Sequence, residues 1–479
     1  MAAEIDEVLW YAKVMKMRSL AREAPRRKRL EALSFCAPRR NRYRGGLVLS
    51  RAMELPKPTI RQALGDKRMV AVLLLSFASG LPFNLTGFTL QAWLASAGLD
   101  IKTIGIFSLV GLPYFLKFLW APLLDRYLPP LLGRRRGWIL IYQVCLAICI
   151  GTMGFCSPTK EPYVLGAVAL MVAFLSASQD IVVDAYRVDV IPPSERALAA
   201  AATTFGYRTA AMLAGAVLVL IAAELEPLLG SSLNWRIAFL MVAGIMAVTI
   251  LATFWAPEPA APGRPPPSLA EAVLNPLRDL LSQKGAWGFL LLVLLYKVGD
   301  AFALSLYSAF MIKGVGFSLA QLSVAGKVNM TVSSMIGVAL GGILYIRWGM
   351  FRSLLVFGIG QALTNLLYMW LAFAGKKLWL LVLATSLDNG IGGMGQAAFV
   401  AFLVSQCSPN FSATQYALLS AMAALPRILM GAIAGQVVAA IGWASFFMVT
   451  CVTAMPGLIL LVIFRRRINE LAEREAAKR

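Results

Sequence analysis

Long apolar runs repeat along this chain between residues 69 and 464. Each run has about 20 residues or more, which is enough for a helix to cross a hydrocarbon core about 30 Å thick. The composition agrees, because 59% of the 479 residues are hydrophobic, only 14% are charged and the mean hydropathy is +0.71. Such values lie far outside those of ordinary globular domains. We therefore predict an all-α, multi-pass membrane protein.

A count of twelve membrane-spanning helices fits the apolar runs best. The predicted cores are 69–95, 104–122, 137–156, 163–186, 197–223, 235–255, 286–312, 319–346, 353–374, 378–405, 415–440 and 445–464. They form two nearly equal halves, 69–256 and 286–464, separated by a proline-rich linker at 257–285. Two six-helix bundles are therefore the expected architecture, and this arrangement resembles that of major facilitator transporters, whose site lies between the bundles at mid-membrane.

The positive charge is distributed as in a membrane protein. The net charge is +21, but lysines and arginines are concentrated on the N-terminal segment and on alternate loops. This pattern predicts that both termini are cytoplasmic, and it argues against nucleic acid as a partner. Residues 1–68 read as a basic, disordered cytoplasmic extension, and residues 465–479 as a cytoplasmic tail.

The chain contains no histidine. Imidazole proton relays, histidine metal sites and Ser-His or Cys-His catalysis are therefore excluded. The six cysteines show no zinc spacing and are interpreted as free, buried side chains. We expect no catalytic residue, no metal and no cofactor, and any proton-carrying group must be a carboxylate.

The segment 176–190 ends an apolar run with three carboxylates and one arginine. Asp180 and Asp184 are four residues apart and share one helix face, with Arg187 on nearly the same face. Ionisable groups at membrane depth usually serve transport or proton movement. We predict that Asp180 or Asp184 carries a coupling proton, with Asp300 and Asp388 behind them. A static charge network that holds this helix in place is the alternative.

The loop at 121–137 reads APLLDRYLPPLLGRRRG, and with four other strings it carries a family resemblance. The others are LPFNLTGFTLQAWL (81–94), SASQDIVVDAYRVDV (176–190), the segment Tyr207–Leu213 and FSATQYALLSAMAALPRILMG (411–431). Together they resemble the AmpG-type muropeptide permeases of the major facilitator superfamily over residues 69–464. Two departures are Ala121 and Pro426, where glycines are expected.

The resemblance implies function and location. Members import anhydromuropeptides from periplasm to cytoplasm across the inner membrane of Gram-negative bacteria, by proton symport with alternating access, for cell-wall recycling and with effects on β-lactamase induction. We expect the carrier to work as a monomer. By the same resemblance, the signature loop gates the cytoplasmic side through Asp125, Arg126, Arg134 and Arg135, of which the arginines also serve as a positive-inside anchor.

Anhydromuropeptides combine sugar rings, an acyl chain and carboxylates, so a site for them needs aromatic faces, amide groups and cations. Asn84 and Gln91 lie on one stripe and are candidates for the cavity wall, while Gly80 and Gly87 on the same stripe read as packing residues. The remaining predicted substrate-binding residues are Trp93, Lys117, Gln179, Tyr207, Arg208, Lys297, Lys327 and Arg427. Structural pairing is the alternative for the cations, as Lys297 with Asp300 or Asp388 with Arg427 or Lys327.

Other functions remain open at this stage. A major facilitator carrier for another anionic solute, such as a coenzyme A ester, shares this style of fourth span. A multispan membrane enzyme is less favoured, because the chain has no histidine and no long outer loop. A channel is also less favoured, because paired halves with buried charges suit alternating access.

Overall fold

The structure is a computed structural model that describes residues 66–470 apart from short gaps at 128, 130–131, 193–194, 260–268, 284 and 408–411. The described part is helical throughout. Nine helical stretches within it are long and apolar enough to cross a membrane. Two of these, Leu319–Ala374 and Leu418–Ile463, each contain two crossings that meet at a glycine, Gly349 or Gly442. With α18, this gives the twelve crossings expected.

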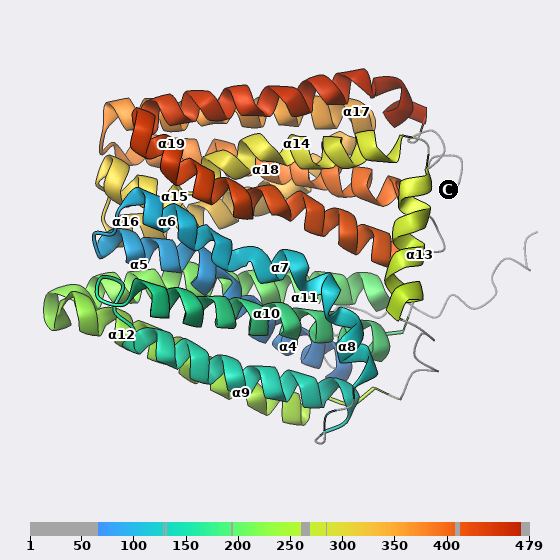
Figure 1. The fold of residues 1–479 in the computed structure, drawn as a ribbon, viewed down its shortest axis with the longest axis horizontal. Helices are drawn as coiled ribbons and strands as arrows, with labels where there is room; N and C mark the ends of the chain where they lie inside the picture. The colour runs from blue at the N-terminus through green and yellow to red at the C-terminus, as the bar shows by residue number, and fades with distance from the viewer. Residues whose placement is uncertain are drawn as a thin grey trace, which may run out of the picture. The chain divides into compact units, whose positions relative to one another are not determined.

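The first six crossings form the N-terminal bundle, drawn blue to green in Figure 1. The first crossing contains α4 (Lys67–Asn84), η1 (Leu85–Thr89) and α5 (Leu90–Ser96). The second contains α6 (Ile101–Phe107), η2 (Ser108–Gly111), α7 (Leu112–Leu116) and η3 (Lys117–Leu119), followed by α8 (Ala121–Arg126). The third is α9 (Arg134–Phe155), the fourth is α10 (Pro162–Val190), and the fifth and sixth contain α11 (Arg196–Met212), η5 (Leu213–Val217) and α12 (Leu218–Trp255), which reverses at Gly230.

The linker carries one helix, and the last six crossings form the C-terminal bundle, drawn yellow to red in Figure 1. The linker helix is α13 (Leu269–Ser282). The bundle contains α14 (Ala286–Leu304), α15 (Tyr307–Ala309) and η6 (Phe310–Val315); α16 (Leu319–Gln321), η7 (Leu322–Val328) and α17 (Asn329–Ala374); α18 (Leu378–Ser405); and α19 (Ser412–Ile463).

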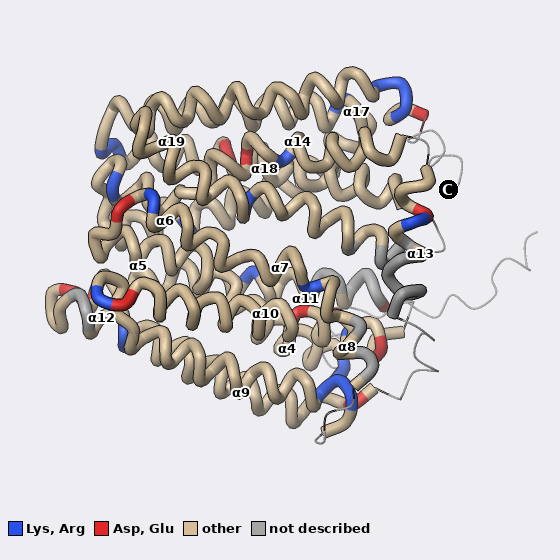
Figure 2. The backbone as a smooth tube through the Cα atoms, in the orientation of Figure 1, with Lys and Arg blue, Asp and Glu red and all other residues tan. Residues whose placement is uncertain are grey.

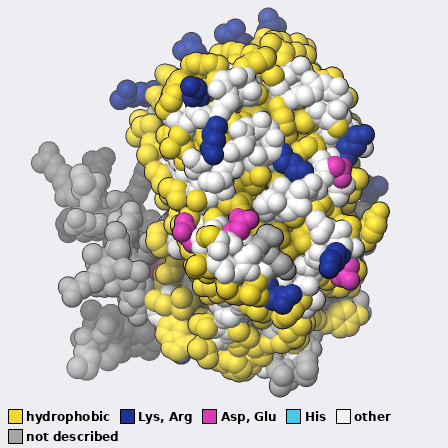
Figure 3. All heavy atoms as spheres, turned by 90° about the vertical axis from the view of Figure 1, so that its left-hand side faces the viewer, with side chains coloured by type: hydrophobic (Ala, Val, Ile, Leu, Met, Phe, Trp, Pro, Cys, Tyr) yellow, Lys and Arg dark blue, Asp and Glu magenta, His cyan; other side chains and the backbone are white. Residues whose placement is uncertain are grey.

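Glycine permits the tight reversals between consecutive crossings. Gly230, Gly349 and Gly442 have φ values of 78°, 74° and 77°. Side chains with a Cβ rarely adopt this region, so glycine is the residue expected at each reversal. Charged residues lie mainly near the ends of the helices, and a few lie inside the bundles (Figure 2). Figure 3, which views the end remote from the C-terminus, shows hydrophobic side chains along the flanks that face lipid.

Four of the crossings contain a π-helical segment, and these segments are η1, η5, η6 and η7. A π turn shifts the i→i−4 pattern and often marks a functional site. Around η5, backbone carbonyls accept side-chain hydrogen bonds from other helices: Thr89 Oγ1 donates to Ala214 O over 2.7 Å, and Ser323 Oγ donates to Ala216 O over 2.7 Å. These π segments are therefore tied to their neighbours by polar contacts that an uninterrupted α-helix does not offer.

Candidate functional site: a cavity between the two bundles

A cavity of about 180 Å³ lies between the two bundles, midway along their helices. Its wall is drawn from α4, η1, α5 to α7, α14, α15, η7, α17 and α19. The lining residues are Phe83, Asn84, Thr86, Gly87, Phe88, Leu90, Gln91, Phe107, Ser108, Gly111, Tyr114, Leu304, Ser305, Tyr307, Ser308, Lys327, Met330, Ala424, Arg427 and Ile428. Both halves of the chain thus contribute to one site, as the two-bundle prediction requires.

The N-terminal wall supplies amides and aromatic rings. Asn84 donates to the backbone oxygen of Ala211, and Gln91 Nε2 donates to Ser305 O across the bundle boundary over 2.6 Å. Phe83 meets the ring of Tyr114 edge-on, with centroids 5.2 Å apart. The predicted stripe of Asn84 and Gln91 therefore faces the cavity.

The two stripe glycines differ from each other. A Cβ at Gly80 would lie 2.5 Å from the carbonyl oxygen of Tyr207, so Gly80 permits the close approach of α4 to α11 that was expected. Gly87 has open space around the corresponding position and lines the cavity. The packing role predicted for Gly87 is therefore wrong, because the helix face it occupies meets the cavity and not another helix.

The C-terminal wall supplies the cations. Lys327, in η7, lies with its Nζ 4.8 Å from the ring centroid of Phe88 on the opposite wall. Arg427, in α19, lines the same cavity. Neither side chain forms an ion pair with an acid among the described residues. The pairing of Asp388 with Lys327 or Arg427, left open by the sequence, is not present.

Gly215 of η5 lies between an amide and a cation of the cavity. A Cβ on it would come 3.0 Å from Asn84 Nδ2 and 3.0 Å from Lys327 Cε. A side chain at this position would therefore press against both walls. The glycine allows the amide of one bundle and the cation of the other to approach the same point.

Six of the predicted substrate-binding residues lie outside the cavity wall. Trp93 is buried among aromatic rings, 5.0 Å from Phe239 and 5.8 Å from Trp235 between centroids. Tyr207 packs against the back of Phe83, with centroids 6.0 Å apart. Arg208 is half-buried on α11. The others are Lys117, Gln179 and Lys297, whose contacts are described next.

Lys117, Gln179 and Lys297 contact groups within their own bundles. Lys117 Nζ is 3.9 Å from Asp180 Oδ2, which is an ion pair inside the N-terminal bundle. Gln179 is completely buried and its amide has no hydrogen-bond partner among the described residues. Lys297 Nζ donates to Gln396 Oε1 over 3.3 Å and lies 5.0 Å from the ring centroid of Phe399. Lys297 and Asp300 do not form the ion pair that their spacing suggested.

The acids of α10 have unequal surroundings. Asp180 is almost buried and accepts a hydrogen bond from Ser79 of α4 in addition to its contact with Lys117. Asp184, one turn later, has a side chain that is 56% exposed and pairs with Arg187 at 3.3 Å. Asp180 therefore lies inside the bundle, while Asp184 lies at its surface.

Two acids of the C-terminal bundle are joined by one glutamine. Gln361 Nε2 donates to Asp300 Oδ1 over 3.0 Å and to Asp388 Oδ1 over 3.3 Å. Asp388 is 1% exposed and also accepts hydrogen bonds from Thr364 and Tyr368, over 2.8 Å and 3.2 Å. Asp388 is thus surrounded by neutral donors and forms no ion pair with a described lysine or arginine.

The bundles touch at the end remote from the C-terminus. Between described residues, the hydrogen bonds that cross the boundary join Gln91, Phe88, Leu99, Ser108 and Ala216 to residues of α14 to α19. In addition, α6 crosses α19 at a glycine seam, defined as Gly105, Gly431 and Gly435. A Cβ on Gly105 would lie 2.6 Å from Gly431 O. The cavity is therefore closed toward this end.

The signature loop is anchored within the N-terminal bundle. Arg135 Nε donates to Asp189 Oδ2 over 2.7 Å. The backbone N–H groups of Arg135 and Arg136 donate to the carboxylate of Glu258 over 3.0 Å and 3.1 Å, at the helix N-terminus that favours an anion. Arg134 begins α9 beside them. Asp125 and Arg126 belong to α8, and their side chains lie outside what the structure describes.

Several lining residues were not singled out from the sequence. Phe83, Phe88 and Tyr307 give the cavity its aromatic faces, and Ser108, Ser305 and Ser308 give it hydroxyls. Phenylalanine and serine are common in any span, so composition carries no signal for them. Phe83 and Phe88 do lie within the string at 81–94 that contains Asn84 and Gln91, which was the available indication.

Comparison with known proteins agrees with this architecture. Residues 72–430 match the family model described as "Major Facilitator Superfamily". The chain is 44% identical over 402 residues to the "Anhydromuropeptide permease" of Escherichia coli (strain K12), covering 84% of this chain and 80% of that protein. It is 30% identical over 418 residues to "Putative transporter AmpG 4" of Rickettsia felis, covering 86% of this chain and 99% of that protein.

Solved structures support the fold. A bacterial homologue of the human lysosomal transporter Spinster, in an inward-facing and unoccupied conformation, superposes with a TM-score of 0.65 at 16% identity, covering 84% of this chain and 97% of that one. A D-xylose-proton symporter gives 0.64 at 14% identity, covering 82% and 96%. The expected all-α fold of two six-helix bundles is confirmed. The chain is therefore a membrane transporter and not an enzyme, and it belongs to the Major Facilitator Superfamily, within its AmpG-type branch.

Proposed function

We propose that this protein imports anhydromuropeptides from periplasm to cytoplasm across the inner membrane of a Gram-negative bacterium, by proton symport with alternating access. The observation that carries the proposal is the cavity between the bundles, which combines amides, aromatic rings and two cations that form no ion pair with a described acid. The name of the relative from E. coli supplies the substrate class. In this proposal the carrier works as a monomer and both termini are cytoplasmic, as the positive-inside pattern favours.

The arrangement of the cavity suggests how such a substrate binds. Lys327 and Arg427 both belong to the C-terminal bundle, and they suit the carboxylates of the peptide. The opposite wall offers Asn84, Gln91 and Tyr114, which suit the acetamido and hydroxyl groups of the sugars. The peptide end therefore rests on the C-terminal bundle and the sugar end on the N-terminal bundle.

The size of the cavity indicates the state of the transport cycle. Small-molecule sites usually have volumes of about 300–1,000 Å³, whereas this cavity has about 180 Å³. A disaccharide with a peptide needs more room. For import, the bundles must separate at the far end to load the substrate and at the end that carries α13 to release it, so we interpret this conformation as closed to the periplasm and contracted around the site.

For the proton, we propose Asp180. Its carboxylate is almost buried inside the N-terminal bundle, where Ser79 donates to it and Lys117 Nζ lies 3.9 Å away. An ionisable group at membrane depth usually serves transport or proton movement. Asp184 is a weaker candidate because it is exposed and already paired.

Asp300 and Asp388 remain the second candidates. Two carboxylates that share one glutamine, with no cation bound to Asp388, are costly to hold charged together at membrane depth. A single proton shared within this group relieves that cost. This pair therefore offers a second place for a proton, in the other bundle.

Uptake into vesicles tests the proposal. Labelled N-acetylglucosaminyl-anhydromuramyl-tripeptide is supplied to vesicles with an imposed proton gradient, in the presence and absence of an uncoupler. Uncoupler-sensitive accumulation supports the proposed function. Absence of uptake by protein shown to be folded rejects the substrate class and leaves the fold standing.

The aspartates are then separated by matched variants. Asp180→Asn is expected to abolish accumulation against a gradient while leaving counterflow between equal substrate concentrations. Asp184→Asn is the control, since its side chain is exposed on the same helix. If Asp180→Asn accumulates substrate as the parent does and Asp388→Asn does not, the proton belongs to the C-terminal bundle.

A further inference from the structure

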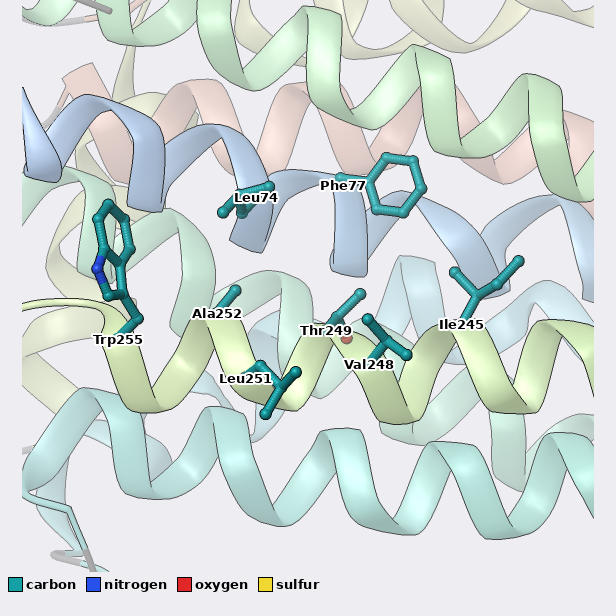
Figure 4. A pocket seen from close by; sticks show the side chains of 8 residues that line it. All are labelled: Leu74, Phe77, Ile245, Val248, Thr249, Leu251, Ala252 and Trp255. Atoms are coloured by element: carbon teal, nitrogen blue, oxygen red, sulfur yellow. The ribbon is translucent and has the colours of Figure 1, made fainter. Parts of the chain in front are cut away.

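A second concave surface lies on the outside of the N-terminal bundle, away from the transport cavity. It is a groove of about 390 Å³ between α4 and α12, lined by Leu74, Phe77, Ile245, Val248, Thr249, Leu251, Ala252 and Trp255. Figure 4 shows Leu74 and Phe77 on α4 facing the side chains of α12. We call this surface the α4–α12 groove. Nothing in the transport mechanism uses it.

The lining of the α4–α12 groove suits an apolar ligand. Seven of its eight residues are apolar. The exception, Thr249, is buried and its hydroxyl donates to Met246 O over 2.6 Å. Apart from the indole N–H of Trp255 at one end, the lining side chains offer a polar solute no free donor or acceptor, whereas an acyl chain needs none. The groove therefore suits a hydrocarbon chain from the surrounding bilayer.

The end of the groove at Trp255 carries positive charge. Lys67, the first residue of α4, is exposed and its Nζ lies 5.2 Å from the centroid of the Trp255 ring. Arg136 donates to the carbonyls of Thr253 and Phe254 in the last turn of α12, over 2.8 Å and 2.7 Å. Tryptophan and lysine at the end of a span are the residues that meet lipid headgroups.

The positive charge at the end of the groove, and not its apolar lining, determines which lipid the groove selects. Lipid tails are as apolar as the groove lining, so a chain that moves from bilayer to groove gains little. A basic residue near the membrane surface does attract anionic lipid. Lys67 forms no ion pair with a described acid, and its ammonium group lies beside the Trp255 ring at the end of the groove.

We propose that the α4–α12 groove binds one anionic phospholipid, with an acyl chain along Leu74, Val248 and Ala252 and its phosphate at Lys67. The site is separate from substrate binding. The proposal of a lipid site does not depend on whether the transported solute is a muropeptide. Its lipid occupies the seam between the first and sixth crossings at the end that carries the linker.

Native mass spectrometry of the full-length protein tests the proposal. The protein is titrated with phosphatidylglycerol and phosphatidylethanolamine of identical acyl chains. One phosphatidylglycerol is expected to be retained with about fivefold preference, which is the order expected for one basic residue. Lys67→Gln should remove the preference. Lys160→Gln, which removes the same charge from an exposed loop at the other end, should keep it.

A second variant and a second readout distinguish loss of binding from misfolding. Ala252→Phe fills the groove and should lower retention of both lipids at this site, with unchanged thermal unfolding. Brominated phosphatidylglycerol should quench the fluorescence of Trp255, and the contribution of Trp255 is obtained as the difference between the parent and Trp255→Phe. This quenching should be smaller in Ala252→Phe. Equal retention of the two lipids by the parent, or unchanged preference in Lys67→Gln, would overturn the proposal.

Discussion

At the scale of single residues, the most informative side chains are the two cations in the cavity wall. Lys327 and Arg427 lie at mid-membrane without an acid partner among the described residues. Unpaired cations at this depth are costly, and proteins retain them where they face a ligand or water. Lys117 looked equivalent from the sequence, but its partner is Asp180. The difference arises because neighbouring helices, and not the helix's own periodicity, supply the partner.

Neutral replacements of the cavity cations should weaken the binding of substrates that carry a peptide. We expect Lys327→Gln and Arg427→Gln each to raise KM for the disaccharide tripeptide about tenfold or more, since a charge-assisted hydrogen bond is worth about 1.5–3 kcal/mol. The disaccharide without peptide should be much less affected. Lys376→Gln, on an exposed loop, is the control, and equal losses for both substrates would argue against contact with the carboxylates.

Asp100 gives a residue-scale prediction outside the membrane. It caps α6, and hydrogen bonds from the Thr103 hydroxyl and the Thr103 N–H lower its pKa. A carboxylate with a lowered folded-state pKa contributes stability above its unfolded pKa of about 3.9, and this stability is lost as pH falls through the folded value. Asp100→Ala should lower stability at pH 7 by about 1 kcal/mol.

Thermal unfolding in detergent measures this effect. The difference in Tm between the parent and Asp100→Ala should narrow as pH drops below about 4. Glu161→Ala provides the comparison, because Glu161 occupies the corresponding position before α10 and makes no side-chain cap hydrogen bond. A loss of equal size in Glu161→Ala would mean that the cap is not the cause.

At the scale of elements, the crossing of α6 with α19 matters most. The glycine seam of Gly105, Gly431 and Gly435 lets the two backbones touch, and Ser108 Oγ donates to Ile428 O beside it over 2.9 Å. These helices belong to different bundles, so this contact must separate whenever the far end opens. The seam therefore sets part of the balance between the two open states.

A methyl group in the seam should shift that balance. Gly105→Ala is expected to favour the state open at the far end, because the new Cβ meets Gly431 O. A cysteine replacing Ser108 should then react faster with an impermeant maleimide added from that side, and uptake should fall. Gly342→Ala, where a Cβ meets open space in α17, should change neither.

The elements also show how far sequence reasoning reaches. Apolar runs located the crossings, because burial in lipid requires continuous apolar length. The same runs did not reveal the π segments η1, η5, η6 and η7. The carbonyls of η5 accept hydrogen bonds from side chains of other helices, which the sequence of one helix does not show. Asn84 and Gln91 line the cavity, whereas Trp93 packs between α5 and α12, since an aromatic residue packs as readily as it binds sugar.

For the whole molecule, the arrangement of two bundles around one closed end leads to a prediction of topology. In a background without native cysteines, Lys160→Cys, in the loop before α10, should be labelled by impermeant maleimide in intact cells. Gln283→Cys, after α13, should react only after the inner membrane is opened. The reverse labelling pattern would mean that the protein lies in the membrane in the opposite orientation, with the same fold.

The placement of both cavity cations on one bundle has a mechanical consequence. If Lys327 and Arg427 bind the anionic end of the cargo as proposed, that end stays on the same carrier surface during a transport cycle, and the opposite surface moves across it. No ion pair between cargo and protein then has to be broken and remade in the middle of the cycle. The largest electrostatic contact of such a cargo then travels unchanged. The contacts that must yield in the switch between open states are those between the bundles, which include the glycine seam, the hydrogen bond from Lys313 to Leu99 O and the contact of Lys327 with the Phe88 ring.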